Sequence, residues 1–205
     1  KKLNIKEFEF SQSYLFFWDK IERANYFLET ILLTAEEPLE SRTVSFLMGD
    51  VLSDGGQWDM IVALVDKYGL VPKASYPDSK NSEASLQMNN ILRAKLREFA
   101  LRLRSRAKES TASLAEVKAG YMAEIYRIVT ICLGPPPATV DWEFRDKSEK
   151  YCKIQCSPLE FYRDHVRPVF NFSDKVCIVN DPRASHPYGS SLSVRHLGNV
   201  VGAPP

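Results

Sequence analysis

The side chains best suited to chemistry in this sequence are its cysteines and histidines. A thiol can act as a nucleophile when a histidine is close enough to take its proton, and both residue types bind zinc. The chain has four cysteines and three histidines, namely Cys132, Cys152, Cys156, Cys177, His165, His186 and His196. Cys152 and Cys156 have a C-x-x-x-C spacing, but no second Cys or His pair matches it. The sequence therefore predicts no metal site and no cofactor, and free thiols in a reducing compartment.

A glycine pair followed by a tryptophan forms a second notable feature. Asp54, Gly55 and Gly56 come directly before Gln57 and Trp58, where a helical pattern begins. Glycine and aspartate are typical of turns. On composition alone, this segment is therefore interpreted as an ordinary turn that leads into a helix.

Amphipathic helices would position this loop. The first is expected to begin at the N-cap Ser11, with an apolar stripe along one side, and to end before the first proline. The second is expected over residues 57–68, with Gly69 directly after its last turn. A later helix is expected to open with a capping box between Ser113 and Glu116.

Another predicted helix, beginning at Ser82, has one apolar and one basic side. The basic side carries Arg93, Lys95, Arg97, Arg102, Arg104, Arg106 and Lys108. Such a face could neutralise nucleic-acid phosphates, or it could be a solvated surface or a salt-bridge surface between subunits. The balanced total charge and the lack of interleaved aromatic residues argue against nucleic acid as a partner.

Two strand patterns follow the helices. Val140, Trp142 and Phe144 alternate with polar residues, which predicts a strand with one wet face, and the chain is expected to pair back on itself over residues 151–154. Residues 176–179 are predicted to form a buried strand. Together with the helices, these patterns predict an α+β protein that is helix-rich in its middle.

The composition is that of an ordinary soluble globular protein. The 205 residues suffice for one large or two small domains, and 27 basic against 26 acidic residues leave a net charge of +1. The sequence shows no apolar run long enough to span a bilayer and no signal peptide, so a membrane location is not expected. The first residue is not Met, and both ends are interpreted as cuts through a longer chain.

Several motifs in register carry a family resemblance. They are FEFSQSYLFFWDK at 8–20, DGGQWDM at 54–60, KYGLVPK at 67–73, WEFRDK at 142–147, PLEFY at 158–162 and VNDPR at 179–183. Over nearly its whole length the chain resembles the bleomycin hydrolase and aminopeptidase C family of papain-like cysteine aminopeptidases. The resemblance implies part of a papain-like cysteine protease fold with a helical insertion. Residues 1–81 would form a segment of the helical lobe with the cleft loop, 82–166 the insertion with subunit contacts, and 167–205 the start of the β lobe.

The same resemblance gives the glycine loop a function. Papain-like enzymes have a glycine pair before a helix at this place, which lines the cleft where the substrate main chain lies extended. A side chain there would block that approach. By this resemblance Gly55 and Gly56 are expected to contact substrate, with Asp54 and Trp58 as supporting residues.

The resemblance also implies an activity that this chain cannot perform alone. The family removes N-terminal residues from peptides, hydrolyses the amide of bleomycin, and forms homohexamers in the cytoplasm. Its nucleophile lies in a Q-x-x-x-x-C-W motif, which none of the four cysteines fits. The catalytic Cys is expected upstream of this chain and its His and Asn partners downstream, so no residue here is assigned a catalytic role. The isolated chain is expected to be inactive and poorly soluble. A non-catalytic helical scaffold remains the alternative if no such flanking segments exist.

Overall fold

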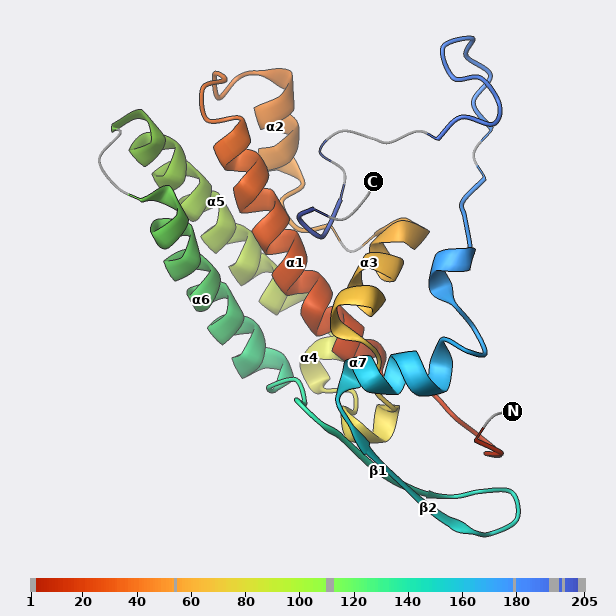
Figure 1. Ribbon diagram of the computed structural model, residues 1–205. Helices are drawn as coiled ribbons and strands as arrows, with labels where there is room; N and C mark the ends of the chain where they lie inside the picture. The colour runs from red at the N-terminus through yellow and green to blue at the C-terminus, as the bar shows by residue number, and fades with distance from the viewer. Residues whose placement is uncertain are drawn as a thin grey trace.

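The computed structural model describes residues 3–53, 55–109, 113–178, 180–191, 196 and 198–202. The α-helices and strands in these ranges are α1 (Gln12–Leu33), α2 (Arg42–Gly49), α3 (Trp58–Tyr68), α4 (Lys80–Glu83), α5 (Leu86–Glu109), α6 (Leu114–Leu133), β1 (Val140–Arg145), β2 (Tyr151–Cys156) and α7 (Pro158–Phe161). Long helices dominate, and a hairpin extends from one end of the molecule (Figure 1). The predicted α+β class is confirmed.

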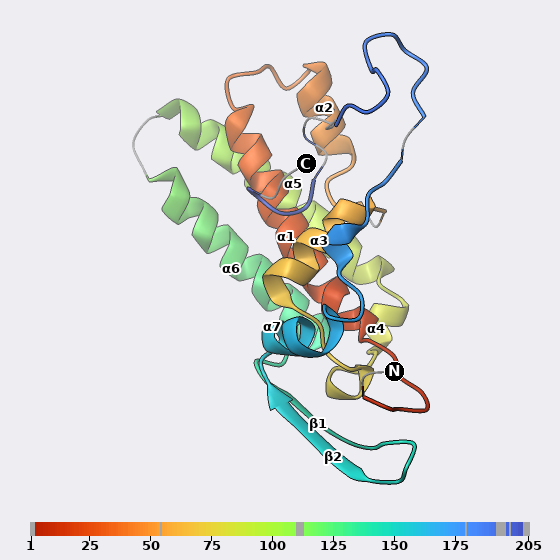
Figure 2. The same cartoon turned by 45° about the vertical axis from the view of Figure 1, so that its right-hand side comes forward.

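The three long helices α1, α5 and α6 share the larger hydrophobic core. They lie side by side in both views (Figures 1 and 2). Phe17 and Leu28 of α1 meet Leu92 and Phe99 of α5 and Ile125 of α6, and all five side chains are almost fully buried. Fully burying one large apolar side chain contributes roughly 1.5–3 kcal/mol to stability. The apolar stripe predicted for the first helix is therefore the face that holds the three helices together.

A second core joins α3, α7 and the hairpin. Val65 of α3, Val140 and Trp142 of β1, and Phe161 of α7 are all buried in it. The strands β1 and β2 pair antiparallel, with Trp142 opposite Ile154. The predicted hairpin is confirmed, and its apolar face covers the end of the helical body from which it extends.

The ends of α1 and α3 follow from local sequence. Ser11 caps α1, because its Oγ accepts a hydrogen bond from the Tyr14 amide at 3.0 Å. Gly69 ends α3 with a φ of 75°, a conformation that glycine adopts readily. The next residue, Leu70, donates its amide to the Pro158 carbonyl at 3.2 Å, so the chain after α3 runs directly against the start of α7. Both predicted end signals are confirmed.

The predicted start of the basic helix is wrong. Ser82 does not cap it. Instead Ser79 and Ser82 cap one another's amides in the short helix α4, and α5 begins at Leu86. Serines that lie three residues apart can each cap a helix, and only the path of the chain selects one. At the start of α6, the Ser113 hydroxyl accepts from the Glu116 amide at 3.4 Å, which is one half of the predicted capping box.

The buried strand predicted over residues 176–179 is also wrong. Val176 is 81% exposed and Ile178 is 95% exposed, and neither belongs to a strand. Val179 lies outside the described residues. Apolar β-branched residues favour a strand only where a neighbouring strand and a core accept them, and here the chain runs over the surface.

Two arginines of α5 donate hydrogen bonds to main-chain carbonyls at the ends of other helices. Arg97 donates to the carbonyls of Met48 at 3.0 Å and Gly49 at 3.1 Å, in the last turn of α2. Arg104 donates to the Thr34 carbonyl at 2.7 Å, directly after α1. The last carbonyls of a helix lack internal partners and carry partial negative charge, so arginine satisfies them well. This part of the basic face therefore serves to join α5 to α1 and α2.

The replacement Arg104→Met is expected to lower the free energy of unfolding by about 2 kcal/mol. Arg104 is 4% exposed, and its guanidinium serves the carbonyls of both Thr34 and Glu37. Methionine fills similar space but leaves both oxygens without their donor. The control Arg102→Met removes only an exposed ion pair with Glu98 and should cost less than about 1 kcal/mol. Equal losses in urea unfolding would contradict this assignment.

Candidate substrate-binding site

The glycine loop lies on the surface at the entrance to α3. Gly55, Gly56 and Gln57 are exposed, and Trp58 begins the helix. The role predicted for Asp54 falls on a residue outside the described part of the chain. The loop passes over α1, where Arg23 donates its Nη2 to the Gly55 carbonyl at 2.7 Å. The loop therefore presents main-chain groups on an open face instead of being packed into the core.

The two glycines differ in the space that a side chain would find. A Cβ built on Gly55 would meet only the Ser53 hydroxyl, at 4.0 Å. A Cβ on Gly56 would lie 3.0 Å from Arg23 Nη2 and 3.1 Å from Met60 Sδ. At position 55 the loop has room for a side chain, so no close contact among the described residues requires glycine there. At position 56 the constraint comes from this protein's own side chains beneath the loop, which the sequence reasoning missed.

A polar network supports the loop from below. Arg23 Nε binds Asp19 Oδ2 at 2.7 Å, one turn earlier on α1. Asn199, which is 2% exposed, donates its Nδ2 to the Met60 carbonyl at 3.0 Å and lies 3.4 Å from the other Asp19 oxygen. The Asp19–Arg23 spacing of i, i+4 was a visible signal for an ion pair. No pattern in the sequence indicated that Asn199 returns to this site.

Trp58 points toward the segment after η2, a π-helical turn over Tyr162–Val166. Its ring stacks on Phe172 with centroids 5.4 Å apart, and its Nε1 donates to the Phe172 carbonyl at 3.3 Å. Phe170 packs edge-on against the same ring at 6.5 Å. Trp58 therefore fastens residues 170–172 to the first turn of α3, directly beside the loop.

Cys156 and His165 lie among contacts with neighbouring side chains. All four cysteines are free thiols. Burial, with the carboxylates of Glu160 and Asp164, raises the pKa of the Cys156 thiol, which is the opposite of what a nucleophile needs. The His165 ring packs against Phe161 with centroids 5.5 Å apart. The surroundings of Cys156 therefore do not favour its thiolate form.

His186 contacts the carboxylate of Asp181. His186 Nδ1 lies 2.7 Å from Asp181 Oδ2. Hydrogen bonds from Arg183, and the contact with His186, hold the pKa of the Asp181 carboxyl well below its usual range. This cluster closes a surface turn over residues 181–186.

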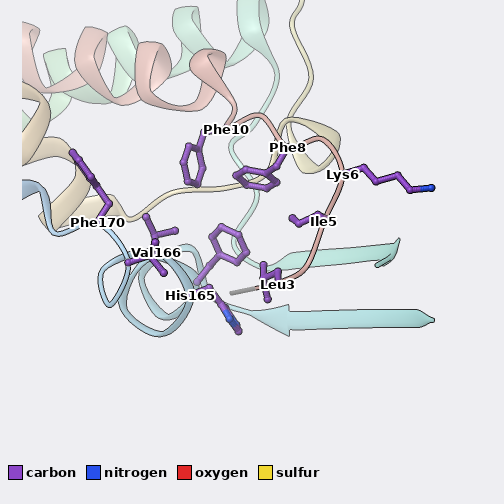
Figure 3. Close-up of a pocket in the computed structure, with 10 residues that line it drawn as sticks. Leu3, Ile5, Lys6, Phe8, Phe10, His165, Val166 and Phe170 are labelled. Atoms are coloured by element: carbon purple, nitrogen blue, oxygen red, sulfur yellow. The ribbon is translucent and has the colours of Figure 1, made fainter. Parts of the chain in front are cut away.

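A separate apolar pocket lies away from the glycine loop. It has a volume of about 280 Å³ and is bounded by the N-terminal segment and the region from α7 to Phe170 (Figure 3). The labelled lining side chains include Leu3, Phe8, Phe10 and Val166, while Lys6 extends away from the others. Its few polar groups do not converge as a reactive site requires.

Within the residues that the structure covers, no group of three or more His, Cys, Asp and Glu side chains could hold a metal ion. Among the same residues, no helix combines the length and apolarity needed to cross a bilayer.

Sequence comparison places the chain in a known family. The chain matches the Peptidase C1-like family over residues 1–205. The chain therefore belongs to the Peptidase C1-like family, and the resemblance seen in its motifs is confirmed.

Three proteins of known name are similar to most of this chain. The chain is 53% identical to the bleomycin hydrolase of Homo sapiens, over 98% of this chain and 46% of that protein. It is 40% identical to the aminopeptidase C of Listeria innocua, over 99% of this chain and 46% of that protein. The crystal structure of PepW from Lactobacillus rhamnosis superposes with a TM-score of 0.92 at 42% identity, covering 98% of this chain and 45% of PepW. The chain thus spans about half the length of these relatives.

Proposed function

We propose that this chain is part of a cysteine-type aminopeptidase and forms one wall of its substrate cleft. In this proposal the main chain of a peptide substrate lies extended along Gly55 and Gly56, and Asp54 and Trp58 support the loop. The thiolate nucleophile and its His and Asn partners lie on segments outside this chain. The observation that carries the proposal is the exposed loop, with open space where a Gly55 side chain would be.

The chemistry of an extended peptide fits such a loop. A peptide main chain offers alternating N–H and C=O groups, and an exposed loop without side chains can pair with them directly. Such pairing holds the substrate without selecting a particular side chain. The remaining steps, attack by a thiolate and stabilisation of the oxyanion, require groups that this chain does not supply.

The relatives support the class of substrate. Proteins named bleomycin hydrolase and aminopeptidase C share 40–53% of the residues aligned with this chain. We extend to this protein the removal of N-terminal residues from peptides and hydrolysis of the bleomycin amide. A cytoplasmic homohexamer, with residues 82–166 as an insertion that contacts other subunits, belongs to the same proposal. The division of the chain into residues 1–81, 82–166 and 167–205 is also part of this proposal.

The nucleic-acid alternative has less support. Arg97 and Arg104 already bind carbonyls of this chain. Elsewhere on α5, Lys95 pairs with Glu124 at 2.9 Å and Arg102 with Glu98 at 2.5 Å. Cations that are already paired within the protein are less able to neutralise phosphates and so to release the counterions condensed on a nucleic acid.

Activity measurements on two polypeptides test the proposal. The full-length protein that carries this chain is expected to cleave a fluorogenic aminoacyl substrate and to lose this activity on alkylation of its thiols. The 205-residue chain alone is expected to show no hydrolysis. Hydrolysis by the isolated chain that survives mutation of all four cysteines, or a full-length protein without peptidase activity, would contradict the proposal.

A further inference from the structure

We propose that Arg23 is a positioning residue that orients the Gly55–Gly56 peptide so that the Gly56 amide faces the substrate. This inference rests on the proposed function, because it assigns a support to the same cleft wall. The juxtaposition that carries it is the Arg23 guanidinium beneath an exposed loop of two glycines, 2.7 Å from the Gly55 carbonyl.

The planarity of the peptide bond links the two glycines. In a trans peptide the C=O of one residue and the N–H of the next point in opposite directions. Arg23 Nη2 holds the Gly55 carbonyl toward α1. The Gly56 N–H must therefore point away from α1, toward the exposed side of the loop. A donor on that side is what the carbonyl of an extended peptide requires.

Arg23 is itself held in place. Its Nε binds Asp19 at 2.7 Å, and both side chains are largely buried. Asp19 in turn lies within reach of Asn199, which also binds the Met60 carbonyl at 3.0 Å. A planar guanidinium fixed at one nitrogen presents its other nitrogens in a set direction. The contact with Gly55 is therefore preorganised by α1 before any substrate arrives.

The identity of Gly56 is tied to the same side chain. A Cβ at this position would lie 3.0 Å from Arg23 Nη2 and 3.1 Å from Met60 Sδ. Any larger residue would push the guanidinium away from the Gly55 carbonyl. The glycine at 56 thus leaves room for the positioning residue, whereas the one at 55 leaves room on the open side.

Loss of Arg23 should weaken binding more than turnover. Two adjacent glycines have wide conformational freedom, so an unheld loop must be ordered each time substrate binds. An interaction that is equal in the ground state and the transition state changes KM and leaves kcat nearly unchanged.

Kinetics of the full-length protein test this with a matched control. Arg23→Gln is expected to raise KM for a peptide substrate roughly three- to tenfold, with kcat changed by less than about twofold. A lysine at position 23 can keep an ion pair with Asp19, but it lacks the second nitrogen that binds the Gly55 carbonyl at the same time. Arg23→Lys should therefore raise KM, while its thermal stability stays nearer to that of the parent. The control Arg97→Gln also removes donors to main-chain carbonyls, at Met48 and Gly49, but should leave KM unchanged.

Hydrogen exchange gives a readout that does not depend on activity. Amides of residues 55–57 should exchange faster in both Arg23 variants and at the parental rate in Arg97→Gln. The inference would be overturned if Arg23→Gln changed neither KM nor the exchange rates of amides 55–57. It would also be overturned if Arg97→Gln changed both by the same amount as Arg23→Gln. A parent protein without peptidase activity would instead defeat the proposed function, and the exchange comparison would still decide whether Arg23 orders the loop.

Discussion

Replacing Gly69 with alanine is expected to lower the free energy of unfolding by about 3–5 kcal/mol. Gly69 has a φ of 75°, which costs an alanine conformational strain. A Cβ there would also lie 2.1 Å from the Pro158 carbonyl oxygen and 2.5 Å from the Leu159 amide nitrogen. Both are main-chain atoms, so no side-chain rotation can relieve the overlap. The contact between the end of α3 and the start of α7 must therefore open.

Gly134 provides the matched control. It ends α6 with a φ of 85°, but a Cβ there would meet nothing within 4 Å. Gly134→Ala carries the strain without the overlap and should cost about 1–2 kcal/mol. Urea unfolding of the full-length protein, followed by circular dichroism, compares the two variants. Equal losses at positions 69 and 134 would show that the close approach between α3 and α7 is absent.

The second large effect is expected at Gly55 and concerns activity alone. Gly55→Leu in the full-length protein should lower kcat/KM for peptide substrates by about 10²-fold, because the side chain enters the space assigned to the substrate main chain. The backbone of Gly55 is not in the left-handed region, and only the Ser53 hydroxyl lies within 4.0 Å of the new Cβ. The melting temperature should therefore remain close to that of the parent protein.

A leucine at another exposed glycine controls for added apolar surface. Gly49 is exposed at the end of α2, and a Cβ there would meet nothing within 4 Å. Gly49→Leu should leave kcat/KM unchanged. If Gly55→Leu retained full activity, or if both variants lost activity equally, the cleft role of the glycine loop would be wrong.

Local sequence patterns predicted those parts of the fold that depend on neighbouring residues. The cap at Ser11, the stop at Gly69 and the hairpin from Val140 all follow from contacts within a few residues or from a regular period. The failures arose where distant contacts decide. Ser79 and Ser82 were both suitable caps, and residues 176–178 lack a partner that would make them a strand.

The candidate site divides in the same way. The resemblance indicated Gly55 and Gly56, and the structure places both on the surface. The support beneath them joins residues far apart in sequence, such as Arg23 with Gly55 and Asn199 with Met60. A single sequence does not predict such contacts, because no period or motif links the positions of the residues that make them.

The most direct test of the central claim is a structure of the full-length protein, with its catalytic thiol replaced, bound to an extended peptide. A main-chain carbonyl of the peptide is expected to accept a hydrogen bond from the Gly56 amide, at about 2.7–3.2 Å between heavy atoms. The Gly55 carbonyl should still accept its hydrogen bond from Arg23. A peptide bound in a productive cleft without contact to residues 55–56, or a glycine loop covered by the protein's other segments, would contradict it.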